Sequence, residues 1–272
     1  MVSSRVNSIR IMGASCLMLA VALVAALGMA AVAPDNAMAA GKTKMAVVTK
    51  VTTTWNDGSV NKTGVNYYSS GLQKTRNYSY TWDGETSKNS NSLVYDKKYR
   101  LKSMTQKDGK KTIGTYSFKW DNKGRVKSAS WKAKGASKST YTSKYYYNNK
   151  GQVRKTTTFM GASTFAYNSD GTLKKWIDDN DETGKTTYTY KYDNQGNPSK
   201  SYYNGNTDFI YKNTYKGGKL VKVKACYNDG SVAYTKTFKY KTVSVPKSLK
   251  KMVNTQQTST MFEILPFAAA HK

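Results

Sequence analysis

Few residues of this chain have the chemistry of a catalyst. The only histidine is His271, one position from the C-terminus, whereas a nucleophile–histidine pair needs a base that the fold holds in place. Cys226 lies in a strand-like segment, residues 223–227, and we interpret it as a small packed residue. Zinc sites need clustered cysteine and histidine, which the sequence lacks. The sequence therefore predicts a protein that is not an enzyme and holds no cofactor.

One acidic cluster, residues 178–182 (DDNDE), could bind a cation. Asp179 and Asp181 match opening positions of a calcium-binding loop. The twelfth position is Tyr190, where such a loop needs a bidentate glutamate. Two interpretations remain, calcium at Asp179 and Asp181 or a solvated hairpin loop, and the turn-forming residue types favour the loop.

Cationic side chains give the strongest chemical signal. The chain has 44 Lys+Arg against 16 Asp+Glu, a formal net charge of +28. Protection of strand edges explains many exposed lysines but not the small number of acids. A positive field of this size attracts polyanions through steering and counterion release. Basic residues recur directly after turns, and the candidate ligand-binding residues are Lys127, Arg154, Lys174, Lys175, Lys222 and Tyr146.

The first forty residues have the pattern of a secretory signal. Arg5 and Arg10 precede an apolar run over residues 11–32, and A-M-A at 37–39 has the small-residue spacing of a cleavage site. We predict a signal peptide over residues 1–39 that directs export from a bacterial-type cell. The alternative is an uncleaved anchor, because the run is about long enough to span a bilayer.

The positions of the two cysteines indicate that the exported chain carries neither a lipid anchor nor an internal disulfide. Cys16 lies near the start of the apolar run instead of just after it, which argues against a lipoprotein. Removal of the signal leaves Cys226 alone, so burial and backbone pairing must hold the fold without an internal disulfide. No later apolar run approaches membrane-spanning length. We expect a monomer without a transmembrane segment, secreted and either soluble or associated with the cell wall.

A repeated pattern of aromatic and turn residues organises residues 40–245. Two or three alternating aromatics lead into Asp or Asn, Gly follows four residues after the last aromatic, and an aliphatic residue comes two positions later. A second set of glycine turns lies between these, so a turn comes about every 12 residues. The last aromatic residues of the repeats are Tyr95, Trp120, Tyr147, Tyr167, Tyr192 and Tyr215.

The segments between turns predict strands. They are rich in Thr, Tyr and Val with period-2 alternation, and glycines and β-branched residues are too frequent for helices. The rings of Tyr188 and Tyr190 share one side, whereas Thr189 and Lys191 share the other. We predict an all-β antiparallel meander of hairpins, which curls on itself or winds into a spiral to cover its aromatic face. The hydroxyls of 22 tyrosines need water or a partner.

Residues 188–197 (YTYKYDNQGN) resemble the YD (tyrosine–aspartate) repeat of rearrangement-hotspot and teneurin-type proteins, and residues 120–126 (WDNKGRV) fit its Y-D-x-x-G-x-L consensus with Trp for Tyr. The resemblance covers residues 78–240 and implies an extracellular β-strand spiral, of the kind that encloses a cargo toxin or acts as a surface module. This chain is too short to close a shell and lacks a distinct toxin domain. Residues 145–151 (YYYNNKG) resemble, less closely, choline- and glucan-binding wall repeats.

The pattern stops at Val245-Pro246, and residues 246–272 form a tail. Residues 248–253 have the composition of a helical turn or two. The apolar positions Phe262, Leu265 and Phe267 suit a cap on the aromatic face, with a disordered tail as the alternative.

These features predict a secreted, non-catalytic, basic β-repeat protein that binds an anionic cell-envelope polymer or glycan. Export removes the usual context for nucleic acid, and no nucleic-acid-binding module is recognisable, so nucleic acid is disfavoured. Two alternatives remain open. One is a secreted enzyme or toxin-associated protein with an unrecognised active site, and the other is a structural spacer of a surface assembly.

Overall fold

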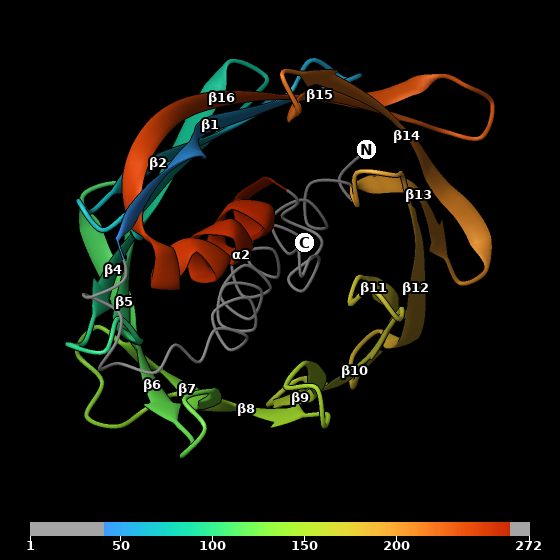
Figure 1. Cartoon of the computed structure of the whole chain (residues 1–272). Coiled ribbons are helices and arrows are strands. Elements are labelled where there is room, and N and C mark those ends of the chain that lie inside the picture. Colours follow the sequence, from blue (N-terminus) through green and yellow to red (C-terminus); the bar gives the residue numbers. More distant parts are fainter. Residues whose placement is uncertain (1–40, 262–272) are drawn as a thin grey trace.

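The computed structural model describes residues 41–261, which form one antiparallel sheet of 16 strands closed into a barrel. Hairpins join consecutive strands, and β1 pairs with β16 to close the ring (Figure 1). The first eight strands are β1 (Lys42–Trp55), β2 (Val60–Tyr67), β3 (Gln73–Trp82), β4 (Glu85–Tyr95), β5 (Leu101–Asp108), β6 (Lys111–Trp120), β7 (Val126–Ala133) and β8 (Tyr141–Tyr147). The others are β9 (Val153–Thr158), β10 (Gly161–Tyr167), β11 (Leu173–Asn180), β12 (Gly184–Tyr192), β13 (Pro198–Tyr203), β14 (Asn206–Lys216), β15 (Lys219–Cys226) and β16 (Val232–Pro246).

Some sequence predictions concern residues outside this range. The predicted signal peptide (1–39), with Cys16, lies outside the described residues. So do His271 and the apolar positions at 262, 265 and 267.

The predicted all-β meander of hairpins is confirmed, and of the two forms left open the sheet curls on itself into a closed barrel instead of winding into a spiral. A barrel closes when its strands turn through a full circle, and strand number rather than total length sets that condition. Strands as short as 6 residues supply the number needed here. The closed wall surrounds the helix α2 (Lys250–Met261), which follows a short 3₁₀ turn, η2 (Lys247–Leu249) (Figure 1).

The two faces of the wall differ as the alternation predicts. On β12, Tyr190 is 7% exposed and points inward, whereas Lys191 is exposed on the outside. Inward rings pack across strands, as between Trp176 and Tyr188, whose centroids lie 4.7 Å apart. Such cross-strand pairs stabilise the sheet by roughly 0.2–1 kcal/mol each.

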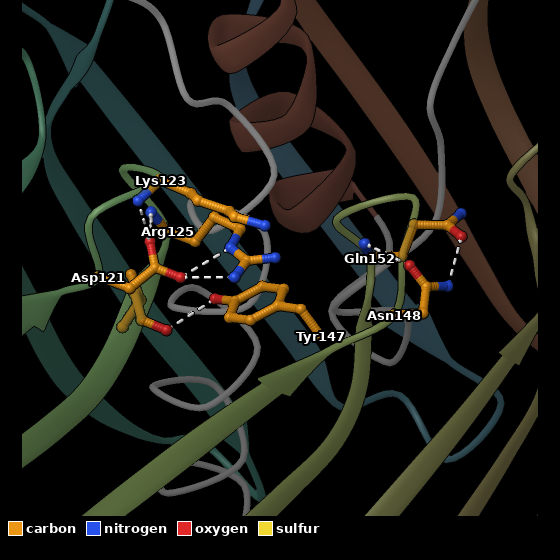
Figure 2. A network of polar contacts seen from close by, with 7 residues as sticks. Asp121, Lys123, Arg125, Tyr147, Asn148 and Gln152 are labelled. Atoms are coloured by element: carbon orange, nitrogen blue, oxygen red, sulfur yellow. Dashed lines mark hydrogen bonds and ion pairs between the residues drawn. The ribbon is translucent and has the colours of Figure 1, made fainter.

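Figure 2 shows two repeat turns that fold around an acidic or amide residue, Asp121 in one and Asn148 in the other. Asp121 Oδ1 accepts the backbone N–H groups of Lys123 (3.0 Å) and Arg125 (2.8 Å), and Asp121 Oδ2 accepts the Arg125 Nε–H (2.8 Å). Gly124 adopts a φ of 72°, which a side chain would disfavour. Asn148 accepts the backbone N–H of Gln152 in the same way (2.9 Å). The Asp or Asn of the repeat is therefore a turn-forming residue.

A hydrogen bond joins the last aromatic residue of one repeat to the turn of the repeat before. Tyr147 Oη donates to the Val126 carbonyl (2.7 Å), and Trp120 Nε1 donates to the Leu101 carbonyl (3.1 Å). Both carbonyls lie at β-bulges, where the sheet register shifts. For the tyrosines concerned, these bonds supply the partner that a buried hydroxyl needs. Five further tyrosines bond in this way: Tyr67 to Val48, Tyr95 to Gln73, Tyr167 to Val153, Tyr192 to Leu173 and Tyr240 to Leu220.

Helix α2 is buried although its sequence is polar. Gln256 Oε1 accepts the backbone N–H of Gln73 (3.0 Å), and Gln257 Oε1 accepts that of Val48 (3.1 Å). Both wall residues lie beside register shifts. Lys236 Nζ donates to the carbonyl of Met261, the last residue of α2 (3.2 Å), where a cation offsets the helix dipole. The polar side chains of α2 thus satisfy backbone groups that the sheet leaves unpaired.

Candidate functional site

The described part of the chain, residues 41–261, holds no group of three His, Cys, Asp or Glu side chains that could bind a metal ion. Cys226 is 2% exposed and carries a free thiol. In the acidic loop, Asn180 Oδ1 accepts the backbone N–H groups of Glu182 (2.9 Å) and Thr183 (3.3 Å), so the loop has its own turn. Calcium at Asp179 and Asp181 remains the less favoured of the two interpretations.

Three of the candidate residues occupy equivalent positions on the outer wall. Lys127, Arg154 and Lys174 are the extra residues of the β-bulges that follow three successive repeat turns. A bulge leaves its extra residue unpaired and turns the side chain out of the regular alternation. All three side chains are exposed.

The same bulge position carries a cation in five successive repeats. Lys74 on β3 and Lys102 on β5 are also skipped by the pairing, and both are exposed. We define this set as the bulge row: Lys74, Lys102, Lys127, Arg154 and Lys174. Its members lie on alternate strands from β3 to β11, so neighbours are about 10 Å apart, two strand spacings.

The three other candidate residues lie beside the row but outside its pattern. Lys175 is half-buried and pairs in register with Ala166. Lys222 pairs with Thr214, because the shorter turn before β15 moves the bulge to Val221. Tyr146 is 40% exposed on the outer face of β8.

Carboxylates do not neutralise the bulge row. Among residues 41–261, ion pairs join Arg100 to Asp96 and Arg125 to Asp121, both at 2.7 Å. Both acids are held within their turns. Burial alone would raise the pKa of Asp121, but hydrogen bonds from the Arg125 backbone and the guanidinium charge hold it below its ordinary value. The row therefore presents uncompensated positive charge to solvent.

A shallow groove of about 410 Å³ lies on the wall over β1–β4. Lys50, Lys62 and Lys88 line it, and all three are exposed. Gly64 pairs with Lys50 and Asn77, and its missing side chain leaves the depression between them. None of the 11 lining residues is acidic. The groove adds a second concentration of positive charge near the first member of the row.

Aromatic rings accompany some outer lysines. Lys200 Nζ lies 5.0 Å, and Lys191 Nζ 5.9 Å, from the centroid of the Tyr202 ring. The ring faces contacted by these ammonium groups stabilise them by roughly 0.5–1 kcal/mol at exposed sites.

Three members of the row are among the candidate residues predicted from the sequence, whereas Lys102 and Lys74 are not. The signal was present, since Gly71 follows Tyr67 by four residues, as in the other repeats. Gln73 stands where the others have an aliphatic residue, which hid the turn. The lysine groove had no local signal, because Lys50, Lys62 and Lys88 meet only through strand pairing.

The sequence pattern described as Teneurin YD-shell matches residues 48–200. No curated protein matches the sequence. Among solved structures, a porin-like protein from Bacteroides uniformis ATCC 8492 is 14% identical with a TM-score of 0.38, over 71% of this chain and 98% of that one. A similar protein from Bacteroides vulgatus ATCC 8482 is 11% identical, with the same TM-score and coverage. A structure titled TcdB2-TccC3-Cdc42 is 12% identical with a TM-score of 0.28, over 64% of this chain and 13% of that one. Over residues 41–261, no helix has the length and apolar character to cross a membrane.

Proposed function

This chain belongs to the teneurin YD-shell family, and we propose that it is an exported, non-catalytic β-repeat protein whose outer wall binds an anionic cell-envelope polymer. The observation that carries the proposal is the bulge row, five exposed cations at equivalent positions of successive repeats.

The geometry of the row suits a polymer better than a small anion. A single phosphate or sulfate needs two or more donors within hydrogen-bond reach, whereas neighbours in the row are about 10 Å apart. An extended chain with repeated negative groups can contact several cations at once. Each contact releases condensed counterions, so a row of weak contacts adds up to useful affinity.

The proposal that the protein acts outside the cell rests on its sequence. The leader over residues 1–39 has the charge, apolar and cleavage pattern of an export signal. Outside a bacterial-type cell the available polyanions are phosphate-rich wall polymers, anionic lipid headgroups and acidic or sulfated glycans. All of them present repeated negative charge to the outer wall of the barrel.

Retention at rising salt tests the proposal. The full chain is passed over immobilised lipoteichoic acid, heparin and neutral dextran. We expect retention on the two polyanions that is lost between about 50 and 200 mM salt, and none on dextran. Retention on one polyanion alone identifies phosphate or sulfate as the preferred group. Equal passage through all three columns at low salt would refute the proposal.

A charge-matched pair of variants tests the row itself. Lys127→Gln, Arg154→Gln and Lys174→Gln together remove three row cations. Lys132→Gln, Lys144→Gln and Lys185→Gln remove three exposed lysines outside it. We expect the row variant to elute at clearly lower salt than the control variant. Equal shifts would show that net charge, and not the row, determines binding.

A further inference from the structure

A patch of rings and acids on the inner wall is separate from the basic outer surface. Phe165, Trp176 and Tyr188 stack across β10, β11 and β12, with interplanar angles of 17° and 20°. Tyr203 on β13 is the next ring after this stack. Its centroid lies 5.2 Å from that of Tyr188, but the two ring planes are tilted by 60°. Tyr203 is 42% exposed, so this end of the stack offers a free ring face.

Register places this stack on the inner face. Lys236, which binds the end of α2, pairs with Val223, and Val223 pairs with Asn213 on β14. Phe209 lies on the same side of β14 as Asn213, since four residues separate them. On the next strands of the barrel, Phe209 pairs with Ser201 of β13, and Ser201 pairs with Tyr190 of β12. Tyr188 is two residues from Tyr190 and therefore lies on the same inner face.

Two donors at this patch have no hydrogen-bond partner. Trp176 Nε1 and Tyr190 Oη are buried and unpaired, in side chains that are 9% and 7% exposed. A buried donor without a partner is unfavourable, so a ligand that supplies an acceptor there recovers free energy. The unpaired groups are therefore a sign of an incomplete site.

Two carboxylates flank the same rings. Asp208 accepts a hydrogen bond from Ser201 Oγ (3.1 Å), and Asp178 accepts one from Ser163 Oγ (2.5 Å). Asp178 lies two residues from Trp176 and therefore on the same face of β11. Both carboxylates raise the pKa of Tyr188, after burial and the neighbouring Tyr203. Burial raises the pKa of Asp208 above its ordinary value. The lysines of β11–β13 that flank this region, Lys175, Lys191 and Lys200, lie on the opposite face.

We propose that the inner ring patch, made of Trp176, Tyr188, Tyr190, Tyr203 and Asp208, binds a neutral oligosaccharide. Sugar hydroxyls both donate and accept, which matches the buried, unpaired Trp176 Nε1–H and Tyr190 Oη–H together with the carboxylate of Asp208. The apolar face of a sugar ring packs on an exposed aromatic ring such as Tyr203. This site is independent of the outer wall and takes a ligand of another class.

Other ligand classes fit the patch less well. An anionic polymer meets Asp178 and Asp208 without a lysine on the same face of β11–β13, so repulsion disfavours it. A quaternary ammonium ion attracts carboxylates and ring faces, but it has no acceptor for Trp176 Nε1 or Tyr190 Oη. A neutral sugar satisfies donors and acceptors together.

Titration calorimetry with the full chain tests the proposal, using maltohexaose, cellohexaose and chitohexaose as probes. We expect at least one to bind, and to bind equally at about 0.5 M salt, where exposed charges are screened. Tyr203→Ala is expected to raise the Kd roughly tenfold, as the loss of one stacking ring. Asp208→Asn, which keeps the shape but removes the charged acceptor, is expected to weaken binding as well.

Tyr146→Ala is the matched control, because Tyr146 is exposed to a similar degree, 40%, on the outer face. It should leave the Kd unchanged. No heat with any of the three hexasaccharides, or equal losses in the two tyrosine variants, would overturn the proposal. Binding of choline chloride in place of the sugars would also overturn it. Loss of polyanion retention without loss of sugar binding would count against the outer-wall function alone.

Discussion

At the scale of single residues, the phenolic hydroxyl is what links one repeat to the next. Tyr147 Oη donates to the Val126 carbonyl, a group that the bulge leaves without a sheet partner. Tyr147→Phe removes this donor and leaves the carbonyl unpaired, so we expect a loss of about 1–2 kcal/mol in the free energy of unfolding. The urea midpoint should fall with an unchanged slope. Tyr146→Phe, one residue away on the outer face, should change stability by less than about 0.5 kcal/mol.

The turn aspartates make the stability of the fold depend on pH in the acidic range. Burial would raise the pKa of Asp193, but hydrogen bonds from Tyr215, Asn213 and two backbone N–H groups hold it below its ordinary value. The pKa of Asp121 is lowered likewise. A carboxyl whose pKa is lower in the folded state stabilises the fold above its ordinary pKa, about 4, and this contribution is lost as pH falls through the folded value.

Asp121→Asn should therefore flatten the pH dependence of stability below about pH 4. Asparagine suits this position, because Asn148 and Asn168 fill it in two other turns. The measurement is the urea midpoint of both proteins at a series of pH values. Parallel curves for the two proteins would contradict the role assigned to the carboxylate.

At the scale of elements, helix α2 depends on its bonds to the wall. Gln256 accepts from the Gln73 backbone through Oε1 and donates to Tyr95 Oη through Nε2. The backbone carbonyl of Gln256 also accepts a hydrogen bond from the guanidinium of Arg76, a residue that is 2% exposed. Gln256→Ala leaves the buried Gln73 N–H unpaired, and we expect a loss of about 1–3 kcal/mol. Faster amide exchange across α2 would show that the helix has loosened from the wall.

Lys251→Ala provides the control for this prediction. Lys251 belongs to the same helix, but its side chain is exposed. Alanine is a good helix former, so the exchange rates of α2 should stay close to those of the original protein. Equal acceleration in both variants would show that helix propensity, and not the glutamine bonds, holds α2.

The elements differ in how far the sequence could predict them. Turns and strand faces were predictable because glycine spacing and period-2 alternation are local signals. The bulge row was found in part for the same reason, since Lys127, Arg154 and Lys174 follow well-formed repeat turns. The burial of α2 was not predictable, because its polar sequence is typical of a solvated helix. Its glutamines have partners only where distant strands form bulges.

At the scale of the whole molecule, closure separates two chemical surfaces. Exposed lysines line the outside, and rings with a few carboxylates line the inside, where the cations Lys236 and Arg76 bond to α2. Closure was not predictable, because it depends on pairs such as Val48 with Tyr240, far apart in the chain and without a shared local signal. A spiral would keep the same strand faces but leave two open edges, which attract other chains.

We therefore expect the pairing of β1 with β16, the seam of the barrel, to keep the chain monomeric, the state predicted from the sequence. Thr52 pairs with Thr237 of β16 on one side and with Lys62 of β2 on the other. Proline at this position removes a backbone donor in the middle of a sheet and clashes with regular pairing. We expect Thr52→Pro to open the seam and expose two strand edges, so that sedimentation velocity detects oligomers. Thr52→Val keeps the backbone donor and a β-branched side chain, and it should sediment as the original protein does. A monomeric Thr52→Pro variant with unchanged stability would show that the β1–β16 pairing does not hold the barrel closed.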